Sequence, residues 1–565
     1  MKKLELLSPA GSMACLKAAV SRKTDSVYLG MTKFGARTFA TNFNKNYLSE
    51  AIKICHSNNI KVYLTMNTLI KNDEIKDFFD QLSFAYSQGI DSVIVQEISF
   101  VDIIKKNFPD LRVHISTQAG VMNSAHSNLI SNADRINLAR ELNKDEIKTI
   151  RSKVNKELEM FCHGALCTCV SGQCIFSSFL GGRSGNRGKC AQPCRKKYDD
   201  KYLLSTKELC LVTEIPEIIK IGLDSVKIEG RMRTPYYVAT ATEEYRKAID
   251  NFYNGNSEID QNSVFKLKKA FNREFTKGWF NQEKNILNNT YSNAVTNTNN
   301  EIYQVNSRDI KTKRKNIKVK LPLFKEQKSK KELMVRVYNK KDAILACKSG
   351  ADIICFDLSD KDFCEIKKNI SCKLFGVTPR IMVDSDKKII LENIKYKNPD
   401  GILAGNLGVL NFGLTVPVYL DYNLNVFNDI DLEYFKSSVP IISPELSLKE
   451  LSCFRDKNFF VLVHGKIRLM TLRHDLIPGE IKDEKGSFIV NRIHNGSEII
   501  NKKELGLLSK SSQLVSNGIN KFYVDTDVNV ENVVKTYRNV LDGKEVRDSR
   551  AKRKYVLGWF YNGVK

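Results

Sequence analysis

The sequence predicts an α/β protein: a (β/α)8 TIM-like barrel that carries a cysteine-rich loop, then a linker and a second, degenerate barrel-like repeat. Three observations predict this fold class. Short apolar runs alternate with stretches of helical spacing in the first half of the chain. The same order recurs in the second half. Both halves also end on a similar tail, FTKGWF at Phe275–Phe280 and YVLGWF at Tyr555–Phe560.

Eight apolar runs are the predicted strands of the first barrel. Their nearly continuous apolar character is typical of parallel strands that are buried on both faces. Stretches of helical spacing between them, such as Asp73–Gln88 and Lys144–Val154, would supply the crossover helices. The predicted strands are Leu4–Ser8, Ser26–Gly30, Val62–Asn67, Ser92–Glu97, Arg112–Gln118, Arg135–Arg140, Glu157–Gly164 and Ser225–Arg231.

The second half contains eight further runs in the same order, and local matches indicate a true repeat. Ala18–Gly30 resembles Ala343–Asp357, and Phe161–Leu166 resembles Val463–Leu469. The chain's 2 tryptophans, Trp279 and Trp559, lie at equivalent places in the two tails. The predicted strands are Met334–Tyr338, Asp352–Asp357, Leu374–Pro379, Gly401–Gly405, Val418–Leu424, Ile441–Leu446, Phe459–Gly465 and Lys521–Thr526.

A length of 565 residues is too great for one hydrophobic core, so we expect separate domains. We place the first barrel at residues 1–255, its tail and a linker at 256–330, and the second repeat at 331–565. Asn285–Asn300 is polar and predicts a loop. Lys311–Lys320 is strongly basic, and we interpret it as a strand that is either a solvated edge or a contact for RNA.

The charge and the cysteines bound the class of protein. A net charge of +25 and a pI near 9.3 favour either a polyanionic partner such as RNA or a lysine-rich solvated surface. We see neither an apolar run of membrane-spanning length nor a signal peptide, and we expect a cytoplasmic protein. In that compartment the 14 cysteines would be reduced thiols or metal ligands.

Cysteines gather after the seventh predicted strand, where barrel enzymes place their active-site loops. Cys167, Cys174, Cys190 and Cys194 follow the spacing C-x6-C-x15-C-x3-C. Thiolates suit zinc or an iron–sulfur cluster, and the absence of paired C-x2-C knuckles favours the cluster. The alternative is a set of buried reduced thiols. The nearby cysteines Cys162, Cys169 and Cys210 could replace a ligand.

Polar residues at the ends of predicted strands are candidates for a site on the same face. His163 and Glu229 could exchange protons with a substrate, and Arg231 could bind a carboxylate. Each could instead close the barrel through hydrogen bonds. We interpret the mid-strand His114 as a core histidine that has its hydrogen bonds satisfied. The further candidates on this face are Ser8, Asn67, Gln118, Arg140 and Glu141.

The loop Gly181–Lys189 (GGRSGNRGK) combines four glycines with Arg183, Arg187 and a lysine. Glycines let backbone N–H groups approach an anion, and the cations supply charge. The loop is therefore a candidate contact for RNA phosphate or for a small dianion. It could equally be a connector that brings Cys190 towards Cys174.

Several of these motifs together resemble the collagenase-like peptidases (the U-32 family). They include ELLSPAG at Glu5–Gly11, YLGMTKFGAR at Tyr28–Arg37, HGALC at His163–Cys167, GGRSGNRGKCAQPCR at Gly181–Arg195 and KIEGRM at Lys227–Met232. SGQC at Ser171–Cys174 and FNREFTKG at Phe271–Gly278 also match, so the resemblance spans roughly the first half of the chain.

The resemblance implies an activity that the residues alone do not define. The family includes prephenate-dependent RNA hydroxylases, and the loop is most similar to the branch that makes 5-hydroxycytidine in large-subunit ribosomal RNA, ahead of the tRNA branch. It implies a 4Fe-4S cluster on Cys167, Cys174, Cys190 and Cys194, prephenate or a similar dianion as a partner, and pairing of the two barrels. Two alternatives remain open: a collagenase-like endopeptidase, and a non-catalytic RNA-binding or assembly factor.

Overall fold

The protein is described by a computed structural model that covers residues 3–256, 261–287, 297–298, 301–308, 310–327, 329–484, 486–544, 546 and 555–565. It divides into two compact units. Unit 1 contains Met1–Gly172 and Gly185–Leu321, and unit 2 contains Gln173–Ser184 and Pro322–Lys565. Most of the loop predicted for Asn285–Asn300 lies outside the described residues.

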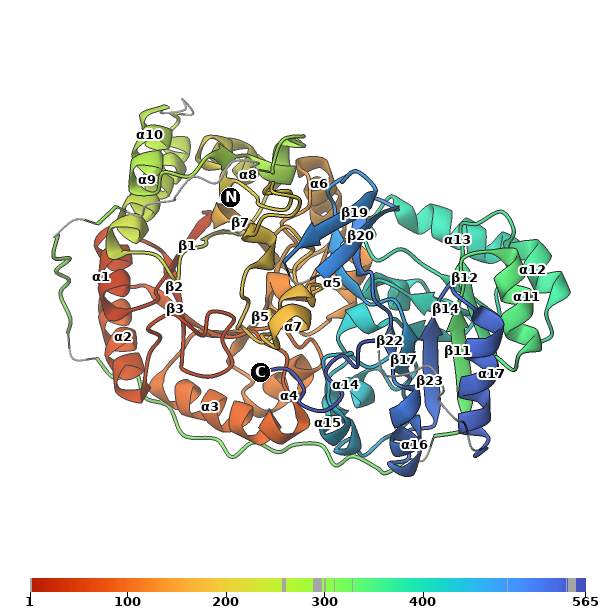
Figure 1. Ribbon diagram of the computed structural model, residues 1–565. Helices are drawn as coiled ribbons and strands as arrows, with labels where there is room; N and C mark the ends of the chain where they lie inside the picture. The colour runs from red at the N-terminus through yellow and green to blue at the C-terminus, as the bar shows by residue number, and fades with distance from the viewer. Residues whose placement is uncertain are drawn as a thin grey trace. The chain divides into compact units, whose positions relative to one another are not determined.

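Unit 1 is a closed barrel of eight parallel strands, drawn from red to yellow in Figure 1. Neighbouring strands follow the chain from β1 to β7, and β9 pairs with both β7 and β1 and so closes the ring. All eight predicted strands are confirmed. They are β1 (Glu5–Pro9), β2 (Ser26–Gly30), β3 (Lys61–Met66), β4 (Ser92–Val95), β5 (Arg112–Ile115), β6 (Arg135–Asn137), β7 (Glu157–Ala165) and β9 (Ser225–Ile228).

Helices cover the outside of this ring, and several begin at side chains that cap free N–H groups. Ser12 accepts a hydrogen bond from the N–H of Cys15, and Asn143 forms a capping box with Glu146. The helices are α1 (Met13–Ser21), α2 (Lys45–Ser57), α3 (Ile75–Gln88), α4 (Phe100–Asn107), α5 (Ser124–Leu129), α6 (Lys144–Lys153), α8 (Ile215–Ile221), α9 (Pro235–Tyr253) and α10 (Gln261–Ala270).

Lys311–Lys320 does not form the predicted strand. Its backbone pairs with helix termini and side chains: the N–H of Arg314 donates to the Ser87 carbonyl at 2.8 Å. Helix α3 ends at Gly89, whose φ is 106°, and a Cβ there would lie 2.4 Å from the Thr312 carbonyl oxygen. The basic segment is therefore an extended connector that packs on helices, because no sheet edge is available to it there.

Unit 2 contains a second ring of eight parallel strands, which the repeat predicted. One sheet runs in the order β16-β15-β14-β13-β12-β11-β23-β17, and a single bridge between Ile441 and Phe460 joins its two ends. The strands are β11 (Glu332–Arg336), β12 (Ile353–Asp357), β13 (Lys373–Val377), β14 (Gly401–Ala404), β15 (Val418–Leu420), β16 (Val439–Pro440), β17 (Val461–Gly465) and β23 (Lys521–Asp525).

The sequence predicted the position of the sixth strand of this ring incorrectly. The strand predicted at Ile441–Leu446 is the two-residue β16, which precedes that range. The helices of unit 2 are α7 (Phe176–Gly181), α11 (Lys340–Lys348), α12 (Phe363–Asn369), α13 (Asp386–Lys397), α14 (Asp429–Tyr434), α15 (Leu448–Ser452), α16 (Leu508–Ser516) and α17 (Val530–Leu541). None of the helices among the described residues is long and apolar enough to cross a membrane.

The two units differ most between their last two barrel strands. Unit 1 has there the cysteine loop and the short strand β8 (Glu208–Cys210), which also pairs with β10 (Phe275–Thr276) from the tail after β9. Unit 2 has instead a four-stranded antiparallel sheet followed by β22 (Leu505–Gly506). The four strands are β18 (Arg468–Leu472), β19 (Gly479–Asp483), β20 (Gly486–Ile493) and β21 (Gly496–Asn501).

Equivalent contacts confirm the repeat at the level of side chains. The Tyr245 hydroxyl donates to the Cys162 carbonyl at 2.7 Å, and the Tyr537 hydroxyl donates to the Val463 carbonyl at 2.9 Å. The next residue in each strand is a histidine, His163 in β7 and His464 in β17. The imidazole of each histidine contacts an aromatic residue of the tail: His163 contacts Phe275, and His464 contacts Tyr555.

Part of the cysteine-rich region belongs to unit 2. The segment Gln173–Ser184 leaves unit 1 after Gly172 and returns at Gly185. Within unit 2 the N–H of Ile175 donates to the Leu469 carbonyl at 3.0 Å. The indole N–H of Trp559 donates to the Ser178 carbonyl at 3.1 Å. These contacts bind the middle of the loop to β18 and to the C-terminal tail.

Candidate functional site: the mouth of the first barrel

Charged side chains fill the lower part of the first barrel. Arg135, from β6, is buried and donates to both carboxylate oxygens of Glu5, at 2.7 and 3.0 Å. It also donates to Glu159 at 3.2 Å. The Lys227 ammonium lies 3.3 Å from Glu159. Because these charges pair with one another, the lumen can hold ionised groups away from water.

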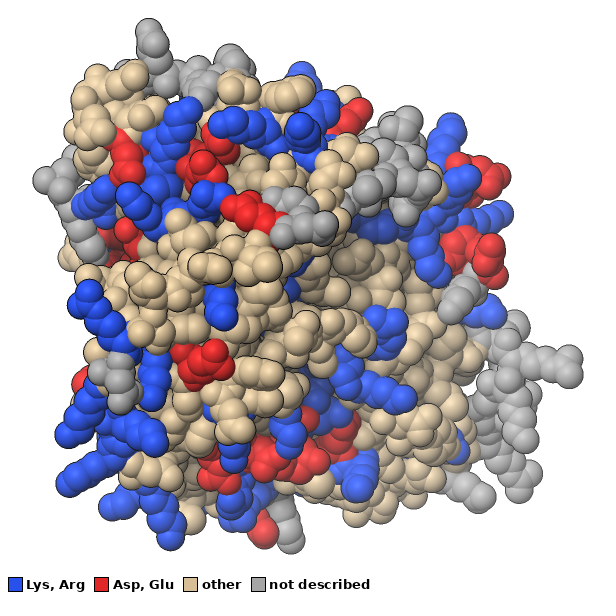
Figure 2. All heavy atoms as spheres, turned by 90° about the vertical axis from the view of Figure 1, so that its left-hand side faces the viewer, with Lys and Arg blue, Asp and Glu red and all other residues tan. Residues whose placement is uncertain are grey.

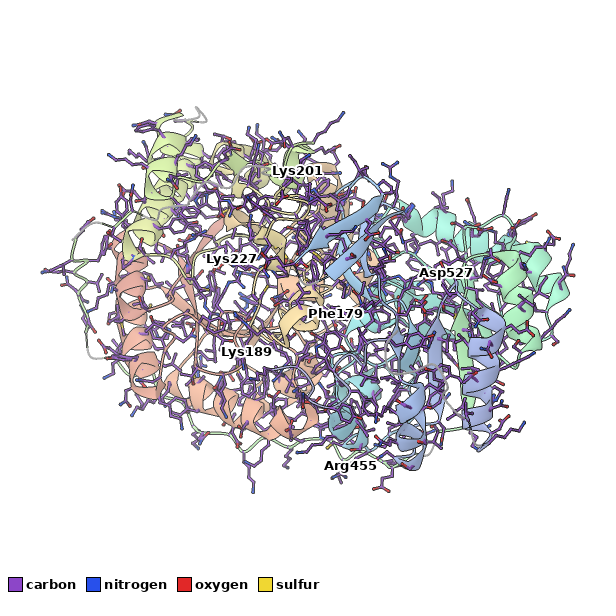
Figure 3. The ribbon with its side chains drawn as sticks, in the orientation of Figure 1. Phe179, Lys189, Lys201, Lys227, Arg455 and Asp527 are labelled. Atoms are coloured by element: carbon purple, nitrogen blue, oxygen red, sulfur yellow. The ribbon has the colours of Figure 1, made fainter. Side chains whose placement is uncertain are left out.

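Above this layer, Lys227 lies between two aromatic rings, and Figure 3 shows it inside the ring of strands. Its ammonium is 4.3 Å from the centroid of Tyr28 and 5.5 Å from that of Phe161. Burial lowers the pKa of Lys227, and Glu159 opposes that shift. The aromatic contacts favour the charged form of the amine as well.

The mouth contains a partly buried ion pair between Glu229, directly after β9, and Arg37. The Arg37 Nη2 lies 3.0 Å from one carboxylate oxygen of Glu229, and its Nε donates to the other at 3.3 Å. Burial alone would raise the pKa of Glu229, but Arg37, Arg140 and Arg231 together hold it below its ordinary value. Glu229 is therefore ionised at neutral pH and can accept a proton or a hydrogen bond but not donate one.

Arg231 fixes the loop that carries Arg37. Its guanidinium donates to the Thr65 hydroxyl at 2.5 Å and to the Asn42 side-chain oxygen at 2.8 Å. It also donates to the Arg37 carbonyl at 3.3 Å. Burial lowers the pKa of Arg231 to about 10, so the side chain stays charged at neutral pH. Of the two roles considered for Arg231, these contacts favour closing the barrel through hydrogen bonds over binding a carboxylate.

Arg140 retains donors that the described residues leave unused. Its guanidinium lies 4.2 Å from the Phe161 ring centroid, and Nη1 donates to the Ala165 carbonyl at 3.2 Å. The buried Nε of Arg140 has no hydrogen-bond partner among the described residues. Arg37, Arg140, Arg231 and Lys227 thus place four cations near Glu229, which suits the binding of an anion.

Of the remaining candidates on the strand ends, Asn67 and Gln118 lie at the mouth, and Ser8 does not. Asn67 accepts a hydrogen bond from the N–H of Ala36 at 3.1 Å and donates to the Ser116 hydroxyl at 3.1 Å. A Cβ on Gly172 would lie 1.9 Å from the Gln118 carbonyl oxygen, so the cysteine loop passes directly over Gln118. Ser8 turns away from the lumen to Thr242 of α9, at 2.9 Å. Glu141 is buried.

His163 is not brought to this mouth. Its ring lies against Tyr237 and Tyr245 of α9, on the outside of the barrel, with Nδ1 3.4 Å from the Tyr245 hydroxyl. Burial lowers the pKa of His163 to about 3, so the ring is neutral. The predicted proton exchange by His163 is therefore replaced by a packing role, because a β-bulge between Phe161 and His163 shifts the side chain to the outer face.

His114 is a core residue, as the sequence predicted, but its ring nitrogens are not satisfied. The ring lies edge-on to Tyr63, with centroids 4.8 Å apart. Neither ring nitrogen has a hydrogen-bond partner within the described ranges. Burial and the nearby Arg135 hold the pKa of His114 well below its ordinary value.

The two loop arginines have different surroundings. Arg187 binds both oxygens of Glu74, at 2.8 and 2.6 Å, and donates to the Leu69 carbonyl at 2.8 Å. Its fork is thus used within unit 1 and is not offered to a substrate, contrary to the prediction. Arg183 is exposed and belongs to unit 2.

The cysteines fall into two groups by accessibility. Cys162, Cys169 and Cys210 are buried, and burial raises the pKa of Cys210 to about 11. The four cysteines predicted as ligands are all accessible: Cys167 and Cys190 are exposed, and Cys174 and Cys194 are partly exposed. Glu229 raises the pKa of the Arg37 guanidinium, and the nearby Cys190 adds a smaller contribution to that rise.

The four accessible thiols suit an iron–sulfur cluster in donor type and in access. Among the described residues no three His, Cys, Asp or Glu side chains are gathered to hold a metal ion. Cys174 belongs to unit 2, whereas Cys167, Cys190 and Cys194 belong to unit 1. The ligand set therefore stays a prediction.

Sequence reasoning missed two central residues of the mouth. Arg37 lies in the YLGMTKFGAR motif, and Lys227 begins KIEGRM. A signal was present for Lys227, because a lysine in an otherwise apolar buried strand needs a partner. Arg37 lies in an irregular loop, for which periodicity gives no position.

Comparison with known proteins gives the first unit a set of relatives. Residues 11–290 match the model of peptidase family U32. An uncharacterised protease of Methanocaldococcus jannaschii is 41% identical over 50% of this chain and 75% of its own. The tRNA hydroxylation protein P1 of Bacillus subtilis is 33% identical over 49% of this chain and 71% of its own. The 23S rRNA 5-hydroxycytidine C2501 synthase of Escherichia coli is 34% identical over 50% of this chain and 46% of its own.

Proposed function

This chain belongs to peptidase family U32, and from that premise we propose that it is an RNA-modifying hydroxylase that forms 5-hydroxypyrimidine. We propose cytidine of large-subunit ribosomal RNA as the preferred target. The observation that carries the proposal is the cation-rich mouth of the first barrel, within the region similar to proteins named for tRNA hydroxylation and rRNA 5-hydroxycytidine synthesis.

The surface charge supports RNA as the macromolecular partner. The chain carries a net charge of +25, and Figure 2 shows Lys and Arg side chains in several groups over one face. Cations that neutralise phosphates give affinity without sequence preference, so the specific contacts would come from the mouth.

We propose that prephenate, or a similar small dianion, binds at the mouth. The unused donors of Arg140 and the amine of Lys227 would bind its carboxylates. Arg37 holds Glu229 ionised, so that Glu229 can accept a hydrogen bond from a hydroxyl group of the ligand. Arg231 would position this pair through the Thr65 and Asn42 contacts.

A 4Fe-4S cluster on Cys167, Cys174, Cys190 and Cys194 is part of the proposal. When bound, such a cluster would supply electron transfer or would hold the cysteine loop in one conformation. Its test is iron and sulfide analysis after anaerobic purification. We expect Cys190→Ser to lose iron and Cys162→Ser, which removes a buried thiol of the same region, to keep it. Equal iron in both variants would reject the ligand set.

The activity is tested by mass spectrometry of RNA from a deletion strain that is complemented with variants. Wild type and Arg308→Met, which changes an exposed arginine, should restore 5-hydroxycytidine. Arg140→Met should not restore it. Full 5-hydroxycytidine in the deletion strain would reject the proposed target. Loss of a hydroxylated uridine in tRNA would move the target to tRNA and keep the reaction class.

The peptidase alternative has less support in the geometry. A cysteine peptidase pairs its thiol with an imidazole that can take up a proton. His163, which directly precedes the cysteine loop, is neutral and packs against Tyr237 and Tyr245. Cleavage of gelatin by the purified protein, lost in Cys190→Ser, would favour this alternative over hydroxylation.

A further inference from the structure

The mouth of the second barrel contains an arginine, Arg336, whose side chain donates no hydrogen bond to the residues that the structure describes, although it lies near Tyr338 and Asp525. Arg336 is the last residue of β11, and it lies opposite Asp525 in the register of β11 and β23. Phe522 of β23 contacts Tyr537 of α17 and so faces the helices. Because side chains alternate along a strand, Tyr523, Asp525 and their register partners face the lumen. Arg336 therefore points into the barrel at the C-terminal ends of its strands.

The other cations of this mouth are paired. Arg380 binds Asp421 through Nε at 3.0 Å and Nη2 at 2.8 Å. Arg468 binds Glu498 at 2.9 Å and also contacts Asp525 and the Tyr338 hydroxyl. These ion pairs use the fork of each guanidinium.

Arg336 has no comparable contact. Across the part of the chain that the structure describes, its guanidinium makes no hydrogen bond or ion pair, and it lies 5.6 Å from the Tyr338 ring centroid. The side chain is half-buried. The Tyr523 hydroxyl, on the neighbouring strand, is buried and also lacks a hydrogen-bond partner among the described residues. The Tyr523 hydroxyl is thus a buried donor left unused, which costs free energy unless a ligand takes it. The half-buried guanidinium of Arg336 offers further donors in the same lumen.

Neither group is inherited from the repeat. Leu7 pairs with Lys227 in the first barrel, and Met334 pairs with Tyr523 in the second. By this register Arg336 corresponds to Pro9, and Tyr523 corresponds to Lys227. The lysine has a buried carboxylate partner, Glu159, whereas the phenol has none within the described residues. The cation and the phenol thus distinguish the second barrel from the first at equivalent positions.

We propose that Arg336 and Tyr523 bind the carboxylate of a small molecule at the mouth of the second barrel. A guanidinium presents parallel N–H donors that match the two oxygens of a carboxylate, and the phenol supplies a third donor from below. The C-terminal ends of barrel strands are where such folds place their ligands. The site does not depend on the hydroxylase proposal, and it would give the second barrel a binding function of its own.

The experiment is ligand-observed NMR of 13C-malonate and 13C-acetate with the full chain at fixed ionic strength. Arg140→Met serves as the background, so that binding at the first mouth does not contribute. We expect saturable binding in this background and in Arg140→Met/Arg492→Met, which also changes an exposed arginine. Adding Arg336→Met should weaken binding at least about 10-fold, the effect of losing a charge-assisted pair.

Two further variants keep the test decisive if Arg336→Met fails to fold. Arg336→Lys keeps the charge but loses the fork, and Tyr523→Phe keeps the ring and loses only the hydroxyl. Each should weaken malonate binding several-fold. The proposal is overturned if the Arg140→Met background binds neither probe, or if these variants bind malonate as the background does.

Discussion

Replacing Arg37 by methionine tests whether the mouth of the first barrel is organised by charge. The side chain of Glu229 is only 12% exposed, and Arg37 contacts both of its oxygens. Removing one partner of a fully buried ion pair leaves the other charge uncompensated, which costs about 3–5 kcal/mol. Arg37 is 32% exposed, and Arg140 and Arg231 remain near Glu229, so we expect the loss in the free energy of unfolding to lie below that range.

The direction in which the stability loss changes with pH follows from the pKa of Glu229. In the wild type this pKa is lowered, so the carboxylate contributes stability above its unfolded value, and that contribution is lost as the pH falls through the folded value. In Arg37→Met desolvation is opposed less, and the folded pKa moves upward. The variant should therefore lose most stability at pH 8 and less at pH 4.5, where Glu229 takes up a proton.

Urea unfolding at both pH values measures this effect. Arg37→Met/Glu229→Gln should recover much of the loss, because the amide carries no charge to bury. Lys33→Met removes an exposed partner of Asp77 and should leave the urea midpoint unchanged. A loss that is equal at both pH values and is not recovered by Glu229→Gln would refute the electrostatic reasoning.

Three further predictions concern the loop and the barrel closure. A Cβ on Gly164 would lie 2.5 Å from the Glu229 carbonyl, whereas one on Gly182 meets nothing within 4 Å, and both residues have positive φ. Gly164→Ala should lower the melting temperature far more than Gly182→Ala does. Gly182→Ala should reduce the free energy of unfolding by only about 1 kcal/mol. Equal shifts in the melting temperature would contradict the close packing of β7 against β9 at the barrel closure. Trp559→Ala should speed alkylation of Cys174, because the Trp559 indole donates a hydrogen bond to the Ser178 carbonyl and so fixes the segment that contains Cys174. Trp279→Ala is the matched control. Equal alkylation rates in the two variants would argue against this role of Trp559. Arg187→Met frees Glu74, so proteolysis near Gly185 should become faster than in Arg308→Met, and unchanged cleavage would count against that anchor.

The strands of both barrels could be predicted because buried parallel strands are continuous apolar runs between helices. Eight starts in unit 1 lie within one residue of the prediction, as for Ser26–Gly30. The errors have local causes. The sixth strand of unit 2 is only two residues long, too short for periodicity to locate. Lys311–Lys320 has the alternation of a strand but pairs with helix ends.

The site was harder to predict than the fold. The sequence indicated Glu229, Arg140 and Arg231 because they follow strands, and these three do lie near one another. It misjudged His163, since one bulge inverts the alternation, and Arg187, since its partner Glu74 lies far away in the sequence. Both depend on tertiary contacts that periodicity does not contain.

The bulge recurs in the second half of the chain. β7 is irregular between Phe161 and His163, and β17 is irregular between Leu462 and His464. In both halves the residue after this irregularity is a histidine that packs against a tyrosine of a long outer helix, Tyr245 or Tyr537. The segments that follow differ, with a cysteine-rich loop in unit 1 and an antiparallel sheet in unit 2. The outward histidine is therefore part of the scaffold that the two halves share, and the segment after it is what distinguishes them.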